Sequence, residues 1–357
     1  MATNSFPPKL TFFERLDLIP ANLSLVAAAV YAAIAGIFRG KSGARYYGKH
    51  IHYAVIRRML WRLSIRQNQY LNPSTNQVYE TFAKTKGFPA QTVQLDHGAQ
   101  GHWIGNKDAK NVLIYYHGGG FAVSANLAYF HLLSDIMDEL NADGKDVAVF
   151  FLTYTLTPHA VYPTQMRQSV EALRYILQKT DREPQNVIIG GDSAGGNLTL
   201  STLAHLSHPH EAIQPLEVSS PLAGAFTIAP WVSFSQDFPS VKENQNKDMI
   251  TSHSATIWSD AYLAGQKPDN YNQPLLAPAE WWKDAKANSV LILAGSDEIL
   301  LSCINEFVEK FKAAVPNTTY IVGQDEPHVG PIISRMLGDF TEGQTTKGWK
   351  SWLSARL

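Results

Sequence analysis

A serine surrounded by small residues is the first feature of the sequence that could do chemistry. Ser193 lies in the run Gly-Asp-Ser-Ala-Gly-Gly, between the apolar stretch 187–190 and a helix-like stretch at 197–206. A serine at such a sharp strand-to-helix turn presents its hydroxyl above the sheet as a nucleophile. The first N–H groups of the following helix would face negative charge forming beside it. Close passage of neighbouring backbone explains the glycines Gly191, Gly195 and Gly196.

A triple glycine follows an earlier strand-like stretch. His117, Gly118, Gly119 and Gly120 come directly after the apolar residues 111–116. Glycines at the end of a strand leave several backbone N–H groups free to point at one place, which is what a tetrahedral oxyanion needs. Loss of one such donor typically costs about 2.7–4 kcal/mol of barrier. Together with Ser193, the glycines predict acyl-transfer chemistry.

A serine at such a strand-to-helix turn needs a histidine base and a carboxylate that orients it, which follow in the chain order serine, acid, histidine. Asp297 lies just past the buried-type strand 290–294, and His328 lies in the loop after a strand at 319–323. His328 is the only histidine after His253. We expect Asp297 to be the acid because it follows the strand most closely. Its neighbour Glu298 is the rival.

These positions require an open, mostly parallel sheet, because functional residues of such sheets lie just past the strand ends. Helical stretches at 164–179 and 302–314 alternate with strand-like runs. The alternation predicts an α/β fold with helices on both faces of the sheet. The expected strands are 112–116, 147–153, 187–190, 224–229, 290–294 and 319–322.

The His-Gly-Gly-Gly and Gly-Asp-Ser-Ala-Gly-Gly motifs, with Asp297 and His328, resemble the hormone-sensitive-lipase family of α/β-hydrolases. The stretch 154–158 and the Pro-Leu-Leu-Ala-Pro run at 274–278 are similar to that family as well. The resemblance implies the α/β-hydrolase fold with a helical cap, and a carboxylesterase mechanism without metal or organic cofactor. It implies an oxyanion hole formed by the N–H groups of Gly119, Gly120 and Ala194. It also implies that the active-site loops are supported by His117, Gly118 and Asp192.

Two segments do not show the alternating strand and helix pattern of the core. Residues 1–90 are expected to form an N-terminal helical arm, and residues 91–357 the hydrolase core. Within the core, 232–273 has no strand pattern and is expected to be a cap insertion. Its aromatic residues would either wall an apolar pocket or pack the cap onto the core. They are Phe234, Phe238, Trp258, Tyr262 and Tyr271.

The arm has three interpretations. Residues 18–38 carry no charge, and about 20 predominantly apolar residues suffice to span a bilayer. Residues 39–79 carry eight Lys or Arg side chains and no acid. We rank half of the cap first, contact of residues 18–66 with an anionic membrane surface second, and a single-pass anchor third. A span with this basic flank would leave the hydrolase domain in the cytosol, so we expect a cytoplasmic protein or one on the cytosolic face of a membrane.

The composition favours a small-molecule enzyme. The 357 residues carry 30 Lys and Arg against 31 Asp and Glu, so charge gives no argument for a nucleic-acid partner. The single cysteine, Cys303, excludes an internal disulfide and a thiol–metal site. The oligomeric state stays open.

The sequence thus predicts a serine esterase acting on a small, largely apolar ester, such as an acylated sterol or secondary metabolite. The alternative is an acyltransferase or lactone-forming cyclase that uses the same three residues, because only the group attacking the acyl-enzyme differs. A triacylglycerol lipase is a further possibility. A catalytically silent binding protein is disfavoured because His328 is present.

Overall fold

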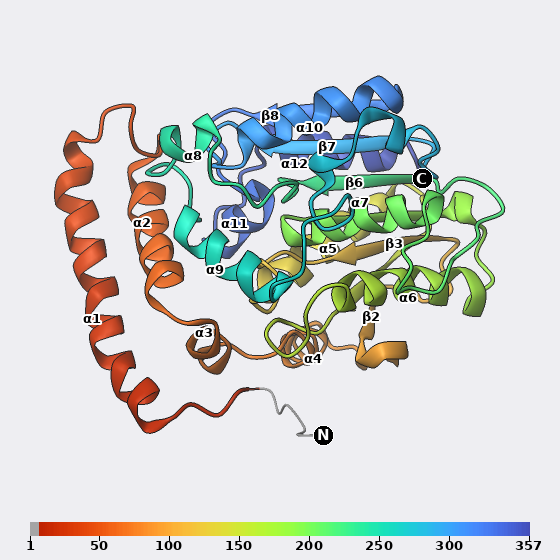
Figure 1. Ribbon diagram of the computed structural model, residues 1–357. Coiled ribbons are helices and arrows are strands. Elements are labelled where there is room, and N and C mark those ends of the chain that lie inside the picture. The colour runs from red at the N-terminus through yellow and green to blue at the C-terminus, as the bar shows by residue number, and fades with distance from the viewer. Residues whose placement is uncertain (1–6) are drawn as a thin grey trace.

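A central sheet of eight strands organises residues 7–357, the part of the chain that the computed structural model describes (Figure 1). The strand order is β1-β2-β4-β3-β5-β6-β7-β8. β2 is antiparallel to β1 and β4, and every pairing from β4 to β8 is parallel. The strands are β1 Thr92–Gln94, β2 Gln100–Ile104, β3 Asn111–Tyr116, β4 Val147–Thr153, β5 Val187–Asp192, β6 Gly224–Ile228, β7 Val290–Gly295 and β8 Thr318–Gly323.

All six strands expected from the sequence are present, with ends within two residues of those expected. Residues of β3, β5, β6 and β7 are buried along their whole length, as parallel strands covered on both faces should be. β1 and β2, at one edge of the sheet, were not predicted from the sequence. β1 has only three residues, too few to show an alternating pattern.

Helices cover both faces of the sheet. Tyr115 and Tyr116 are consecutive in β3 and therefore point to opposite faces. The Tyr115 ring packs near Tyr129 of α5 and Trp349 of α12. The Tyr116 hydroxyl donates to the carbonyl of Ser169 in α6. The helices of the core are α5 Leu127–Ala142, α6 Thr164–Lys179, α7 Ala194–Ser207, α10 Leu301–Ala314, α11 Gly330–Met336 and α12 Gln344–Ser354.

Two helical segments lie outside this layered core. The N-terminal helices are α1 Phe12–Ala35, α2 Tyr47–Arg62, α3 Ile65–Leu71 and α4 Thr75–Lys86. The segment 232–273 holds α8 Pro239–Glu243 and α9 Ser252–Leu263. α1 and α2 form a hairpin at one side of the molecule, with α2 between α1 and α9 (Figure 1). The arm therefore meets the rest of the protein next to the insertion.

Candidate active site

Ser193 occupies a strained turn between β5 and α7. Its φ is 51°, in the left-handed region that side chains rarely adopt. Two backbone hydrogen bonds hold the turn: Ser193 N–H donates to Ile228 O at 2.9 Å, and Trp231 N–H donates to Ser193 O at 3.0 Å. A Cβ on Gly195 would lie 1.8 Å from the carbonyl oxygen of Tyr116, so only glycine fits there. The strain and the close packing are the geometry expected of a nucleophile elbow.

His328 connects Ser193 to a carboxylate. Its Nε2 lies 2.8 Å from Ser193 Oγ, and its Nδ1 lies 2.9 Å from Oε2 of Glu298. A carboxylate only accepts hydrogen bonds, so Nδ1 carries the proton and Nε2 accepts from the serine hydroxyl. The other carboxylate oxygen, Oε1, accepts from Gly295 N–H at 2.7 Å. All three side chains are buried, and their order along the chain, serine, acid, histidine, is the one that accompanies a nucleophile elbow.

The expectation that Asp297 orients His328 is wrong. The acid in contact with the histidine is its neighbour Glu298. Both follow β7, but the Glu298 side chain folds back onto the N–H of Gly295 and so points to His328. Asp297 points elsewhere and pairs with Lys247 at 3.6 Å. Which of two adjacent acids faces inward depends on the turn after the strand.

The charges around His328 favour its protonated form. Burial alone lowers the pKa of His328, but the hydrogen bond and charge of Glu298, with Asp248 and Asp192 nearby, outweigh burial and raise the pKa above 6.5. An imidazolium formed when Ser193 loses its proton would thus be stabilised where it forms.

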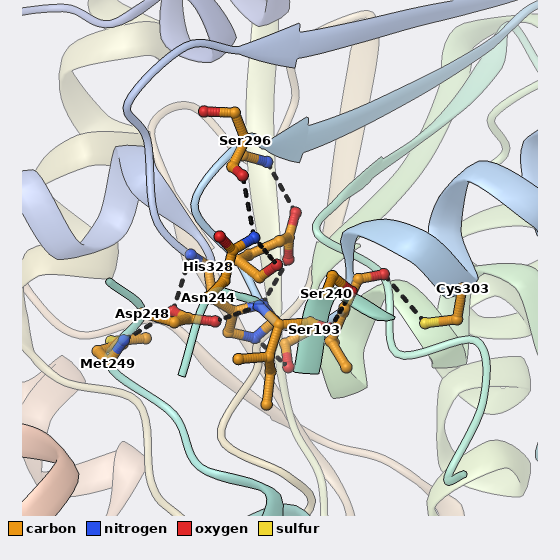
Figure 2. Close-up of polar contacts among 12 residues, drawn as sticks. Ser193, Ser240, Asn244, Asp248, Met249, Ser296, Cys303 and His328 are labelled. Atoms are coloured by element: carbon orange, nitrogen blue, oxygen red, sulfur yellow. Dashed lines mark hydrogen bonds and ion pairs between the residues drawn. The ribbon is translucent and has the colours of Figure 1, made fainter. Parts of the chain in front are cut away.

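Asp248, which the sequence analysis missed, supports the histidine from the insertion. Its carboxylate accepts from the backbone N–H groups of His328 at 3.1 Å, Ile299 at 2.8 Å and Met249 at 2.7 Å (Figure 2). Burial raises the pKa of Asp248 to about 6. Asp248 thereby joins the loop of His328 to the turn that carries the acid.

Asn244 holds the same turn. Its side-chain amide donates to the carbonyls of Ser296 at 3.0 Å and Glu298 at 2.9 Å. The sequence pattern gives little indication that Asn244 and Asp248 belong to the site, because both lie in a segment without regular periodicity. Segment 232–273 therefore contributes to the geometry of the site.

Asp192 braces the glycine loop. Its carboxylate accepts from the hydroxyls of Tyr115 at 3.0 Å and Tyr129 at 2.8 Å, and from Gly118 N–H at 2.9 Å. Burial raises the pKa of Asp192 to about 6, although these hydrogen bonds oppose the shift. The ring of His117 is buried and donates from Nδ1 to the carbonyl of its neighbour Gly118 at 2.7 Å. These contacts keep the loop in place without exposing either side chain.

Two of the residues expected to donate to the oxyanion, Gly119 and Gly120, line the same cavity as Ser193, and the third, Ala194, follows Ser193 in the chain. Within residues 7–357, the N–H groups of Gly119, Gly120 and Ala194 have no hydrogen-bond acceptor in the protein. Gly119 and Gly120 have φ values of 101° and 59°, which favour glycine. Ala194 begins α7 immediately after Ser193, at the end of the helix that carries partial positive charge.

Ser193 and His328 open into a cavity of about 830 Å³. Its lining is mostly apolar and comes from distant parts of the chain. α2 contributes Ile56, Met59 and Leu60, and the insertion contributes Met249, Ile250 and Trp258. Both segments outside the core therefore form pocket wall. The size and lining suit a small, largely apolar molecule.

The aromatic residues of the insertion divide between two roles. Trp258 lines the cavity and contacts the glycine loop, where a Cβ on Gly120 would lie 2.2 Å from its ring. Tyr262 instead stacks on Phe121 at 3.8 Å, and Phe234 packs against Trp231. Within residues 7–357, no group of three or more His, Cys, Asp or Glu side chains is arranged to hold a metal ion.

Comparisons with known proteins agree with this architecture. A family model described as alpha/beta hydrolase fold matches residues 113–331. Steryl acetyl hydrolase 1 of Saccharomyces cerevisiae is 27% identical over 241 residues, which cover 62% of this chain and 54% of the yeast protein. Putative acetyl-hydrolase LipR of Mycobacterium tuberculosis is 26% identical over 213 residues, covering 60% of this chain and 61% of its own length. The chain thus spans less than two thirds of these relatives.

Solved structures share the fold. A hormone-sensitive lipase from a metagenome library superposes with a TM-score of 0.62 at 22% identity, covering 85% of this chain and 97% of the other. An esterase of the bacterial hormone-sensitive lipase family has a TM-score of 0.61 at 23% identity, covering 80% and 92%.

Proposed function

The chain belongs to the alpha/beta hydrolase fold family, and on that premise we propose that it is a serine carboxylesterase that hydrolyses a small, largely apolar ester. One observation carries the proposal. The hydrogen-bonded series from Glu298 through His328 to Ser193 ends at the wall of an apolar cavity. A base and a hydroxyl in hydrogen-bond contact, with the base oriented by a third group, are the signature of an activated nucleophile.

In the proposed reaction Ser193 Oγ attacks the ester carbonyl carbon while Nε2 of His328 takes the hydroxyl proton. The N–H groups of Gly119, Gly120 and Ala194 hold the oxyanion of the tetrahedral intermediate. His328 then gives the proton to the leaving alcohol, and an acyl-enzyme remains. Water, deprotonated by the same histidine, attacks the acyl-enzyme and releases the acid.

The names of the relatives support an acetyl or other short acyl group on an apolar alcohol. The yeast relative is a steryl acetyl hydrolase, and a Streptomyces hygroscopicus relative, 27% identical over 224 residues, is an acetyl-hydrolase. The cavity supports the same choice, because its apolar wall would favour the alcohol portion by burial. We propose that α2 of the N-terminal arm and the segment 232–273 together form the cap over this cavity.

Hydrolysis of p-nitrophenyl esters from acetate to palmitate tests the proposal. The wild type should turn over short esters fastest, and Ser193→Ala should lose about six orders of magnitude in kcat without a change in unfolding midpoint. Near-normal rates in Ser193→Ala would refute it. If Ser193 reacts with a fluorophosphonate but no ester is hydrolysed, the result favours acyl transfer or lactone formation as the reaction of the protein.

The arm supports a second element of the proposal, contact with a membrane surface. The segment Phe12–Phe38 has the length and apolar composition of a membrane-crossing helix, and only 17% of its most apolar window is buried. We propose a protein that works at the surface of a lipid membrane.

A further inference from the structure

The polarity of α1 is reversed relative to an ordinary surface helix. The residues that it buries completely against the protein are Ala21 and Ala32. Asp17 and Ser24 also face inward, beside the half-buried Leu18 and Leu25. The large apolar residues of α1 mostly face outward. Surface helices of globular proteins normally bury their large apolar side chains and expose polar ones.

The outer side chains form a continuous stripe. They recur every three or four residues and are each between 51% and 67% exposed: Leu16, Ile19, Leu23, Val26, Val30, Ile34 and Ile37. Phe13, Tyr31 and Phe38 widen the apolar face to about 140° of the helix circumference, at 100° per residue. A two-helix coiled-coil seam is narrower. A face this broad fits a lipid layer better than one partner helix.

Contacts along its whole length hold α1 against α2. Near the start of α1, Arg62 pairs with Asp17 through two hydrogen bonds. At the middle, Arg58 Nε donates to Ser24 Oγ at 3.1 Å, and near the end the Tyr47 hydroxyl donates to Ala33 O. α1 therefore lies flat along α2 and does not project from the molecule, as Figure 1 shows.

α2 is itself fixed to the hydrolase core. Arg57 donates to the backbone carbonyl of Asp248. Other residues of α2 line the active-site cavity. A membrane-crossing orientation of α1 in this packing would carry Arg57, Arg58 and Arg62 of α2 to the depth of the hydrocarbon. Ionised side chains there are strongly unfavourable.

Cations outnumber acids around the stripe, and the two acids of α1 are paired with arginines. From residue 18 to residue 79 the chain has eight Lys or Arg and no acid. Exposed cations lie beyond both ends of the stripe, with Lys9 and Arg15 on one side and Lys41 on the other. Cations next to an apolar helix face are attracted by anionic lipid headgroups.

We propose that α1 lies in the plane of an anionic membrane surface, with its apolar stripe inserted at the boundary of headgroups and acyl chains. This rests on the membrane contact proposed above and specifies its geometry: the helix docks along the surface and does not cross the bilayer. α2 then separates the lipid from the cavity, so the active site is held one helix away from the membrane.

Flotation with vesicles of phosphatidylcholine and phosphatidylserine tests the contact. We expect the wild type to float with vesicles containing phosphatidylserine, and Leu23→Glu/Val30→Glu to lose at least tenfold in bound fraction. Leu276→Glu, at an apolar residue 54% exposed elsewhere, is the matched control and should float like the wild type. Unchanged urea midpoints would show that all variants fold. Failure of the wild type to float would overturn the proposal.

Depth measurements separate the in-plane geometry from a span. The only native cysteine, Cys303, is buried, so single cysteines at Ile19, Val26 and Ile34 can be labelled selectively with NBD. Quenching by lipids with spin labels at different depths should place all three at one shallow depth. A deep position at 26 with shallower ones at 19 and 34 would show a crossing helix and contradict the proposal.

A second copy of the chain is the other occupant that the stripe could accept. Without lipid, sedimentation should give the same oligomeric state for the wild type and for Leu23→Glu/Val30→Glu. A dimer that depends on the stripe, in a protein that ignores vesicles, would assign the face to self-association instead. These measurements need no substrate, so their failure is distinct from failure of the esterase assignment.

Discussion

Nδ1 of His328 lies 2.9 Å from a carboxylate oxygen of Glu298, while Asp297, one residue earlier, faces Lys247. The two acids are adjacent in sequence and both are buried. Only one can fix the tautomer of the histidine, and the turn after β7 decides which.

Substitution of the two acids should have unequal effects. Glu298→Gln leaves one acceptor oxygen where Gly295 N–H and His328 Nδ1 each use one, and its NH2 group would favour the wrong histidine tautomer. The kcat for p-nitrophenyl butyrate should therefore fall by about 10⁴-fold. Asp297→Asn loses an ion pair that is partly open to solvent, and kcat should stay within tenfold of the wild type. The reverse order of effects would restore Asp297 as the orienting acid.

The pH dependence of kcat/KM should report the environment of His328. Catalysis needs the neutral imidazole, so activity falls as pH drops through the histidine pKa. The pKa is raised, which places the midpoint of the acid limb above pH 6.5 in the wild type. In Glu298→Gln burial remains while the main opposing interaction is lost, so the residual activity should show a midpoint at lower pH. An unchanged midpoint would mean that Glu298 does not act on the histidine.

Asp248→Asn tests the link between the insertion and the histidine loop. The amide keeps one acceptor oxygen for three buried N–H groups, so the free energy of unfolding should fall by about 1–3 kcal/mol in urea titrations. The loss of negative charge should also move the acid limb to lower pH. Asp237→Asn, at an exposed position in the same segment, is the control and should do neither. If both variants behave alike, Asp248 has no positioning role.

Alanine substitutions at two glycines with positive φ distinguish the effect of backbone strain from the effect of crowding at the site. A Cβ on Gly119 would lie 2.5 Å from the carbonyl of Val123, whereas one on Gly144 would meet nothing within 4 Å. Gly144→Ala should therefore lose about 1 kcal/mol of stability and keep its kcat. Gly119→Ala should displace the expected oxyanion donor and lose at least about 10²-fold in kcat. Equal kinetics in the two variants would remove Gly119 from the proposed oxyanion hole.

Much of the fold was predictable because its strands are buried on both faces. β3, β5 and β7 read as continuous apolar runs, and glycine motifs mark where two of them end. Ser193 and His328 follow from position, since Ser193 directly follows β5 and His328 lies in the loop after β8. The three residues of β1 carry too little pattern to be recognised.

The remaining features depend on contacts that a sequence pattern does not encode. The choice between Asp297 and Glu298 depends on the direction of a single turn. Asp248 reaches the histidine through backbone N–H groups of a segment 80 residues away in sequence. The apolar residues of α1 were evident from the sequence, but their outward orientation emerges only when α2 is seen against the inner face.

Stoichiometric labelling with a fluorophosphonate tests the central claim most directly, because the reagent reacts much faster with an activated serine than with an ordinary hydroxyl. Intact mass should show one adduct per chain, peptide mapping should place it on Ser193, and hydrolysis of p-nitrophenyl acetate should fall in proportion to the labelled fraction. Full activity in completely labelled protein, or an adduct on another residue with Ser193 unmodified, would contradict the assignment of Ser193 as the nucleophile.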